Sequence, residues 1–329
     1  MGKADNVTKD YISDIDVFAD AFNYLIYDGR AVVKPEGLSP VDTSSLLNVF
    51  GDIKKEKNSE FIQRYRDIIN KAIIQENDKA TYVLLGIEAQ TDIHYAMPVR
   101  NMIYDGLQYA KQVNHYRVLH KIRGHRSSAA EFLSGMHADD YLIPVITLVI
   151  YFGTEQWDGA RRLSDMMYKT SDVIMKYVQD YEIVLIEPHS MNDNEFDKFS
   201  TDLGEVLKFI KYAGNEKFMK HVLEQNSAYH NMQPKAAKVL KECAKLNVKI
   251  DSNQEVIDMC KAWDDHKKAG IREGLKEGIK EGVTEGTMQT KKKFAIKMYN
   301  TGNSIEEIAD FFEETEEQIK EWVLEPTLV

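Results

Sequence analysis

The sequence of residues 81–90, TYVLLGIEAQ, decides the fold. Its residues favour β-structure and its middle is apolar, so it predicts a buried strand. Glu88 and Gln90 are two residues apart and would therefore point to the same face of that strand. A carboxylate in an apolar strand needs a polar partner or a cation, because an unpaired buried charge is costly. The stretch thus predicts a core strand that ends in a polar site.

The segments around this strand predict an α/β protein. Apolar runs at residues 141–152 and 181–186 predict two more strands, and apolar spacing predicts helices at 10–27 and 96–118. Residues 35–40 predict a loop, and the charged segment 54–79 fits either a helix or a strand. After residue 190 the pattern is helical only, with helices expected at 194–213, 215–229, 234–245 and 253–268. We therefore expect an α/β core over residues 1–190 and a helical region over 191–268.

The C-terminal part contains a repeat with a period of four residues. Glycine recurs from Gly270 to Gly286 and glutamate from Glu273 to Glu285. Residues four apart share a helix face, yet each glycine costs a helix ~1 kcal/mol relative to alanine. Residues 269–289 are therefore either a helix that associates with another helix, giving a homo-oligomer, or a flexible, partly helical linker.

The last segment, residues 290–329, predicts short helices in a helix-turn-helix-like order. Ser304 and Glu307 have the spacing of a capping box, and Thr315 is placed to cap the last helix. From Ser304 onward there are nine acidic residues and one lysine, which opposes phosphate contact. A packing or oligomerisation module explains this tail as well as a DNA reader does.

The overall charge restricts how the protein could contact nucleic acid. The chain of 329 residues carries a net charge of −11, which argues against a protein that coats nucleic acid non-specifically. Residues 111–130 nevertheless contain no acid, and they predict either a phosphate-facing patch or a solvated loop. The basic residues of this segment are Lys111, Arg117, Lys121, Arg123 and Arg126.

Compartment signals are few but consistent. There are two cysteines, Cys243 and Cys260, and neither is in a metal-type pair. No apolar run approaches the ~20 residues needed to cross a bilayer, and the first residues lack an apolar secretory segment. We expect a protein of the cytoplasm, a reducing compartment, with no membrane partner.

The chemistry is expected at a pair of carboxylates. Asp67 precedes Glu88 by 21 residues, and two carboxylates at the end of a core strand can hold Mg²⁺ or Mn²⁺. Such an ion can activate water for attack on a phosphodiester. The alternative is that Glu88 ends its strand near solvent and pairs with an arginine or a lysine. Arg100, at the start of the following helix, fits either a phosphate contact or a salt bridge to Glu88 or Asp105.

Several segments together resemble the Rpn-type family of recombination-promoting nucleases and transposases, which belongs to the PD-(D/E)XK nuclease superfamily. The resemblance spans most of residues 10–190, and the glycine-glutamate repeat is also similar to tails in that family. The segments that carry it are residues 18–23, 66–68, 86–90, 97–100, 104–105, 151–153 and Trp157.

The resemblance implies a restriction-endonuclease-like core, a central mixed sheet flanked by helices, followed by the helical region. It implies that Asp67 and Glu88 bind the metal and that Gln90 stands where the wider superfamily has a lysine. Glutamine cannot carry that positive charge or accept a proton in that way. Asp20 would be a further acidic metal contact, or else a carboxylate on a helix surface.

The function expected from this resemblance is Mg²⁺-dependent endonucleolytic cleavage of DNA, linked to mobile DNA or host defence. Asp67, Glu88 and Gln90 would form the catalytic site. The alternative is a catalytically weak or inactive protein that has kept the nuclease fold as a DNA-binding or oligomeric interaction module. The missing lysine and the acidic tail favour that alternative.

Overall fold

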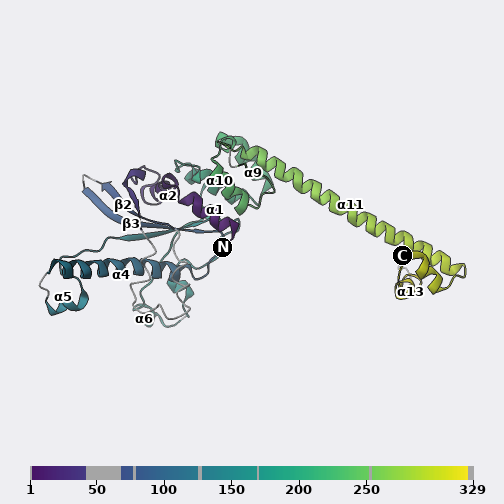
Figure 1. Ribbon diagram of the computed structural model, residues 1–329, viewed down its shortest axis with the longest axis horizontal. Helices are drawn as coiled ribbons and strands as arrows, with labels where there is room; N and C mark the ends of the chain where they lie inside the picture. Colours follow the sequence, from purple (N-terminus) through teal and green to yellow (C-terminus); the bar gives the residue numbers. More distant parts are fainter. Residues whose placement is uncertain are drawn as a thin grey trace. The chain divides into compact units, whose positions relative to one another are not determined.

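The computed structural model describes residues 2–41, 68–76, 79–124, 128–168, 170–251 and 254–324. The chain divides into two compact units, Met1–Trp263 and Asp264–Val329 (Figure 1). Among the described residues, no helix combines the length and the apolar character that crossing a membrane requires.

The first unit is built on a five-stranded mixed sheet. Its spatial order follows the chain: β1 (Leu38–Pro40), β2 (Ile68–Glu76), β3 (Lys79–Gln90), β4 (Val145–Tyr151) and β5 (Val184–Ile186). The first three strands pair antiparallel, whereas β3, β4 and β5 pair parallel. Strand β3 is therefore central, since it joins the antiparallel and the parallel halves.

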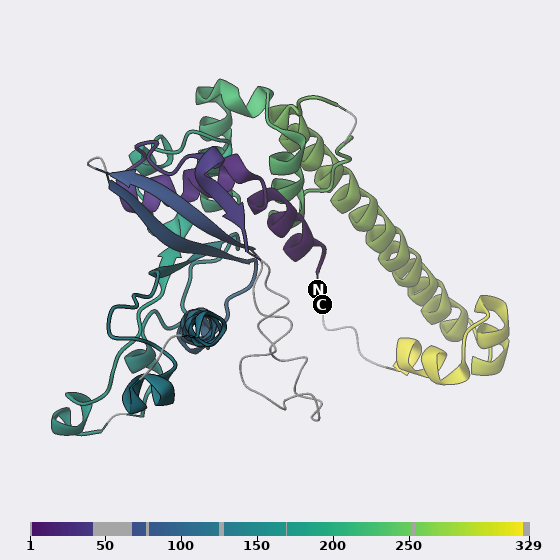
Figure 2. The same cartoon turned by 60° about the vertical axis from the view of Figure 1, so that its left-hand side comes forward.

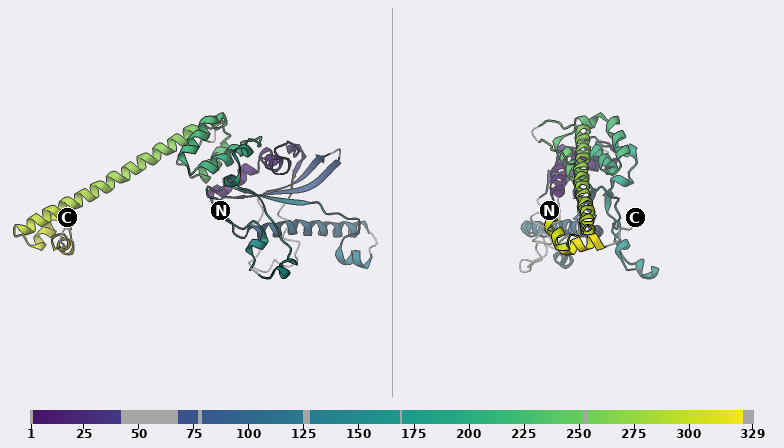
Figure 3. Two further views of the ribbon diagram at one scale, coloured as in Figure 1. Left: turned by 180° about the vertical axis from the view of Figure 1, so that it is seen from behind. Right: turned by 90° about the vertical axis from the view of Figure 1, so that its right-hand side faces the viewer.

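Helices cover both faces of the sheet (Figures 1 and 3). On one face lie α1 (Lys3–Ile12), α2 (Ile15–Tyr27), α8 (Leu203–Tyr212) and α10 (Pro234–Cys243), which share a hydrophobic core with Leu85 and Ile87 of β3. The long helix α4 (Met97–Arg123) runs along the other face, where Met97 packs with Val149 and Tyr151 of β4. Because side chains alternate along a strand, Glu88 and Gln90 belong to the α4 face.

Short elements complete this unit. The helices are α5 (Ala129–Ser134), α6 (Asp172–Met175), α7 (Asp193–Phe196) and α9 (Glu216–Gln225). The 3₁₀ turns are η1 (Pro35–Gly37), η4 (Leu163–Met166), η5 (Pro188–Ser190) and η6 (Ser227–His230).

The central elements expected from sequence are confirmed: β3, β4, β5 and α4. The helix expected at 10–27 is two helices, because Asp14 begins α2 by accepting a hydrogen bond from the Asp16 N–H at 3.2 Å. The loop expected at 35–40 contains η1 and β1. The ambiguous segment 54–79 is a strand over the part that β2 covers, while residues 54–67 lie outside the described residues.

The boundary expected at residue 190 does not separate two cores. Helices α8 and α10 pack into the same hydrophobic core as α1 and α2. The expected long helices of this region are also shorter: residues 194–213 contain α7 and α8, and residues 215–229 contain α9 and the start of η6. The helical region is thus part of the sheet-containing unit, because it buries one face of the sheet.

The second unit consists of the greater part of α11 (Met259–Asn300), followed by α12 (Ile305–Phe312) and α13 (Glu316–Leu324) (Figure 2). The repeat at 270–286 is part of the continuous helix α11. Ser304 and Glu307 form the expected capping box, and Thr315 Oγ1 accepts from the Gln318 N–H at 3.3 Å. A small core of Ala295, Ile308, Ala309, Ile319 and Trp322 holds the three helices together.

Candidate functional site

Glu88 lies at the centre of the candidate site. Its side chain is fully buried near the end of β3, between the sheet and α4. One carboxylate oxygen, Oε2, accepts a hydrogen bond from Arg100 Nη2 at 3.0 Å, so the salt-bridge alternative for Arg100 is confirmed. Arg100 Nε in turn donates to Tyr104 Oη at 2.7 Å, one helical turn further along α4. The acid in the apolar strand is therefore paired, because α4 brings a cation to it.

A second acid, Asp105 of α4, belongs to the same polar layer. Asp105 accepts hydrogen bonds from Thr147 Oγ1 of β4 at 2.5 Å and from Tyr181 Oη at 2.6 Å. Asn101 is fully buried on α4, and its side-chain amide makes no hydrogen bond in the described part of the chain. Such a polar layer is unusual between a helix and a sheet, because buried polar groups are costly unless they are paired or bind something.

Gln90 is the last residue of β3 and is partly exposed. It lies next to a cleft of about 540 Å³ at the carboxyl ends of β3 and β4, which Thr91, Asp92, Tyr151 and Glu155 help to line. Burial, with the negative charges of Asp92 and Glu155, raises the pKa of Tyr151 to about 12. The carboxyl ends of parallel strands are a common location for ligand sites.

Asp67, the first expected metal ligand, lies outside the described residues. The next residue in the chain, Ile68, is the first residue of β2 and pairs antiparallel with Ile87, the residue before Glu88. The described strands therefore bring the start of β2 to the end of β3 that contains Glu88.

Asp20 is placed differently from either expectation. It is buried on α2, so the helix-surface alternative is wrong. Its carboxylate accepts hydrogen bonds from the N–H groups and hydroxyls of Ser200 and Thr201, at 2.6–3.1 Å. These bonds account for its burial without a metal ion and attach α2 to the segment that leads into α8.

His94 is a residue that the sequence analysis did not single out. It lies in the turn between β3 and α4, and its Nδ1 is buried without a hydrogen bond in the described part of the chain. Burial, followed by the nearby charge of Arg100, lowers the pKa of His94 below its ordinary value. A neutral imidazole is therefore held near the Arg100–Glu88 pair, a placement that only the turn geometry reveals.

The expected basic patch is largely on α4. Lys111, Arg117, Lys121 and Arg123 all belong to this helix, with the last three exposed, whereas Arg126 lies outside the described residues. The sequence of residues 111–130 contains no acid. The structure nevertheless places the next residue, Glu131 of α5, beside the basic residues of α4. Arg117, Lys121 and Glu131 line a cavity of about 490 Å³ together with His120 and His137.

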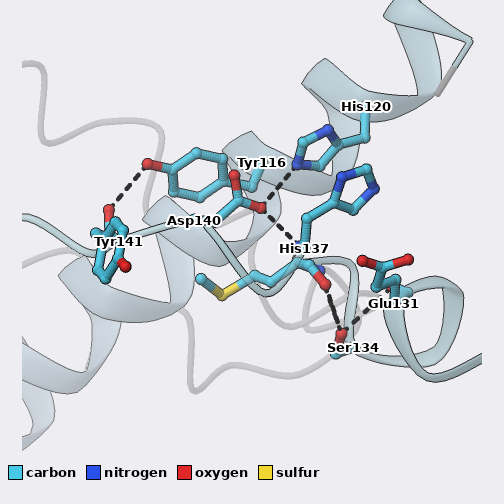
Figure 4. Close-up of polar contacts among 8 residues, drawn as sticks. Tyr116, His120, Glu131, Ser134, His137, Asp140 and Tyr141 are labelled. Carbon is cyan, nitrogen blue, oxygen red and sulfur yellow. Dashed lines mark hydrogen bonds and ion pairs between the residues drawn. The ribbon is translucent and has the colours of Figure 1, made fainter. Parts of the chain in front are cut away.

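The end of this patch is ordered by a histidine–aspartate cluster (Figure 4). Asp140 Oδ2 contacts His120 Nε2 at 2.7 Å and accepts from the His137 N–H at 2.7 Å, and the two imidazoles stack with centroids 3.6 Å apart. Burial alone would raise the pKa of Asp140, but the hydrogen bonds from His137 and His120 outweigh it and lower that pKa. Gly135 ends α5 with φ +77°, a conformation that other residues rarely adopt.

Fold and site together define an α/β protein with a buried acid at the end of the central strand and a helix with basic residues across that face. Residues 53–242 match the family model described as "Putative transposase, YhgA-like". This match covers more than half of the chain, and the protein therefore belongs to that family. Neither a curated protein nor a solved structure gives a significant match.

Proposed function

We propose that this protein is a metal-dependent DNA endonuclease whose catalytic site contains Asp67, Glu88 and Gln90. The observation that carries the proposal is Glu88, a fully buried carboxylate at the end of the central strand. The described start of β2, where Ile68 pairs with the residue before Glu88, supports including the preceding acid, Asp67, in the proposal.

The donor set at this position fits a hard divalent cation. Glu88 offers a carboxylate and Gln90 an amide oxygen, and Mg²⁺ and Mn²⁺ prefer oxygen ligands. We therefore propose Mg²⁺, or Mn²⁺, as the cofactor, held by Asp67 and Glu88. The mixed sheet, with an antiparallel β2–β3 pair followed by parallel strands, supports the finer assignment to the PD-(D/E)XK fold.

When bound, the cation would lower the pKa of a water and stabilise charge on the phosphate. Gln90 can orient water or phosphate by hydrogen bonds but cannot take a proton. His94 is neutral at neutral pH and can do so, because its pKa is lowered. We propose that His94 supplies the proton acceptor that a lysine at position 90 would otherwise provide.

The proposed DNA surface is the C-terminal half of α4. Arg117, Lys121 and Arg123 are exposed on the same helix whose start contributes Arg100 to the buried site. Contacts to phosphates position DNA without reading its sequence. A role in mobile DNA or host defence follows from the family resemblance.

The second candidate is an interaction protein that retains the fold without efficient catalysis. It is favoured by the ion pair, since Arg100 occupies an oxygen of the carboxylate that would bind the metal. Homo-oligomerisation through the 270–286 helix suits either candidate.

The test is nicking of supercoiled plasmid in Mg²⁺ by the full chain. We expect Asp67→Asn and Glu88→Gln to abolish nicking, and Glu182→Gln, a matched change at an exposed acid, to leave it unchanged. Calorimetry with Mn²⁺ should show binding that Glu88→Gln removes. Nicking that survives both site variants would refute the assigned site, and absence of both nicking and Mn²⁺ binding in the unmodified protein would favour the interaction protein.

A further inference from the structure

Three side chains of types that bind metal ions lie close to one another in the first unit, on other elements than Glu88. They are His230 at the end of η6, and Asp258 and Cys260 at the start of α11. One ligand atom from each, an imidazole nitrogen, a carboxylate oxygen and the thiol sulfur, lies within 4.8 Å of the other two. No other group of this kind occurs among the described residues.

The backbone fixes this convergence. Met232 and Ile257 form an isolated antiparallel bridge, with both N–H groups donating to the opposite carbonyl at 3.0 and 2.8 Å. The bridge brings the residues after His230 next to the residue before Asp258. Tyr229, fully buried with its hydroxyl on the Glu205 carbonyl at 2.9 Å, anchors η6 from the other side.

Each of the three side chains makes a polar contact. His230 Nδ1 lies 3.1 Å from Asp258 Oδ2, while Asp258 Oδ1 accepts from the Lys261 N–H and so caps α11. Burial opposes ionisation of Asp258, but the bonds from Lys261 and His230 outweigh it and keep its pKa below the ordinary value. Cys260 Sγ is partly exposed and makes a weak bond, 3.6 Å long, to the Leu223 carbonyl.

We propose that His230, Asp258 and Cys260 form a binding site for a transition-metal ion, with Zn²⁺ as the best match. Nitrogen, oxygen and sulfur together are typical of Zn²⁺ and unlike the all-oxygen sites of Mg²⁺. Zinc bonds of 2.0–2.3 Å place tetrahedral ligands about 3.3–3.6 Å apart. The thiol sulfur, within 4.8 Å of the other two atoms, therefore needs to approach by at most about 1.5 Å. Water completes the four ligands.

Binding deprotonates Cys260 and selects one tautomer of His230. The Cys260 thiol loses its proton to solvent, because the thiolate is the metal ligand. In the metal-bound form the His230 imidazole carries its proton on Nε2, so that Nδ1 can bind the metal. The ion would connect the first turn of α11 to η6, and it is independent of the nuclease proposal because it shares no residue with that site.

The test is titration of the reduced, chelator-treated full chain with Co²⁺, followed by displacement with Zn²⁺. We expect a saturable one-to-one thiolate-to-cobalt charge-transfer band that Zn²⁺ removes. Cys260→Ser should abolish the band, and His230→Ala and Asp258→Asn should weaken Co²⁺ binding at least about tenfold. Asn preserves the helix cap, and His230 is half-exposed, so neither change should unfold the chain.

The matched controls are His221→Ala, at an exposed histidine, and Cys243→Ala, at the other thiol. Both should bind Co²⁺ as the unmodified protein does. The proposal is overturned if the unmodified protein shows no band, if the band survives Cys260→Ser, or if His230→Ala binds as tightly as the unmodified chain. Circular dichroism of each variant confirms that it is folded.

Discussion

The Arg100–Glu88 pair gives the sharpest prediction about the site. At 3.0 Å the gross attraction is about 5 kcal/mol at an effective dielectric constant of 20, but desolvation cancels part of it. Breaking a buried pair by removing one partner costs about 3–5 kcal/mol. Arg100 keeps 16% of its side chain exposed, so we expect Arg100→Met to cost about 3 kcal/mol, the lower end of this range.

The same change should cost far less once Glu88 is neutral. In the Glu88→Gln background Arg100→Met breaks no ion pair and removes only hydrogen bonds, including the one to Tyr104. We expect these to be worth about 1 kcal/mol together, so the coupling energy is about 2 kcal/mol. For a unit of this size 1 kcal/mol corresponds to about 2–4 °C in Tm. Arg100→Met should therefore lower Tm by about 6–12 °C alone and by about 2–4 °C in the Glu88→Gln background.

The assay is a double-mutant cycle measured by thermal and urea unfolding. Arg162→Met is the control, since Arg162 pairs with Glu182 at the surface, where both side chains are more than half exposed. This control should cost less than about 1 kcal/mol. Equal costs of Arg100→Met in the two backgrounds would refute the reasoning, because they would show that Glu88 and Arg100 do not interact.

Three further changes test other features. Asp20→Ala should destabilise the first unit by about 2–4 kcal/mol, since several donors lose their acceptor. It should not change nicking per folded molecule. An unchanged free energy of unfolding would contradict the structural role of Asp20. His94→Gln should flatten the loss of stability between pH 7 and 5 in urea unfolding. In the folded chain the pKa of His94 is lowered, whereas in the unfolded chain His94 takes up a proton near pH 6.5. The free energy of unfolding therefore falls as the pH drops from there toward the lowered folded pKa. If the free energy of unfolding depends on pH equally in the variant, His94 is not the cause. Gly278→Ala should raise helicity by circular dichroism, worth about 1 kcal/mol, because a Cβ there meets nothing within 4 Å. Weaker self-association of this variant in sedimentation would show that a second copy packs against the glycine.

The parts of the fold that local pattern determines are predicted well from sequence. The β3 strand, the α4 helix and the Ser304 cap depend on residues close together in the chain, and all three are confirmed. The site residue Glu88 is also found this way, because a single acid in an apolar strand contrasts with its neighbours.

Features that depend on distant residues are not predicted. Asp20 bonds to residues 180 positions further along the chain, and no local pattern distinguishes it from a surface acid. The sequence alone does not decide which residue Arg100 contacts. Glu88 lies 12 positions earlier, and a contact over that separation depends on how α4 lies on the sheet. The packing of α8 and α10 on the sheet is not predicted for the same reason: both have an ordinary helical pattern, and only the shared core shows that they cover the sheet.

The glycine repeat lowers the stability of the helix α11. Five glycines cost α11 about 5 kcal/mol relative to alanine, and surface ion pairs return only about 0.2–0.5 kcal/mol each. The column formed by Ile271, Leu275, Ile279 and Val283 is 59–70% exposed within the described residues. A helix with five glycines and an exposed apolar column gains stability if a partner covers that column. The proposed partner is a second copy of the chain. Because a period of four exceeds 3.6, the column winds in the right-handed sense, so two such helices should cross in the class near −50° rather than as a left-handed coiled coil.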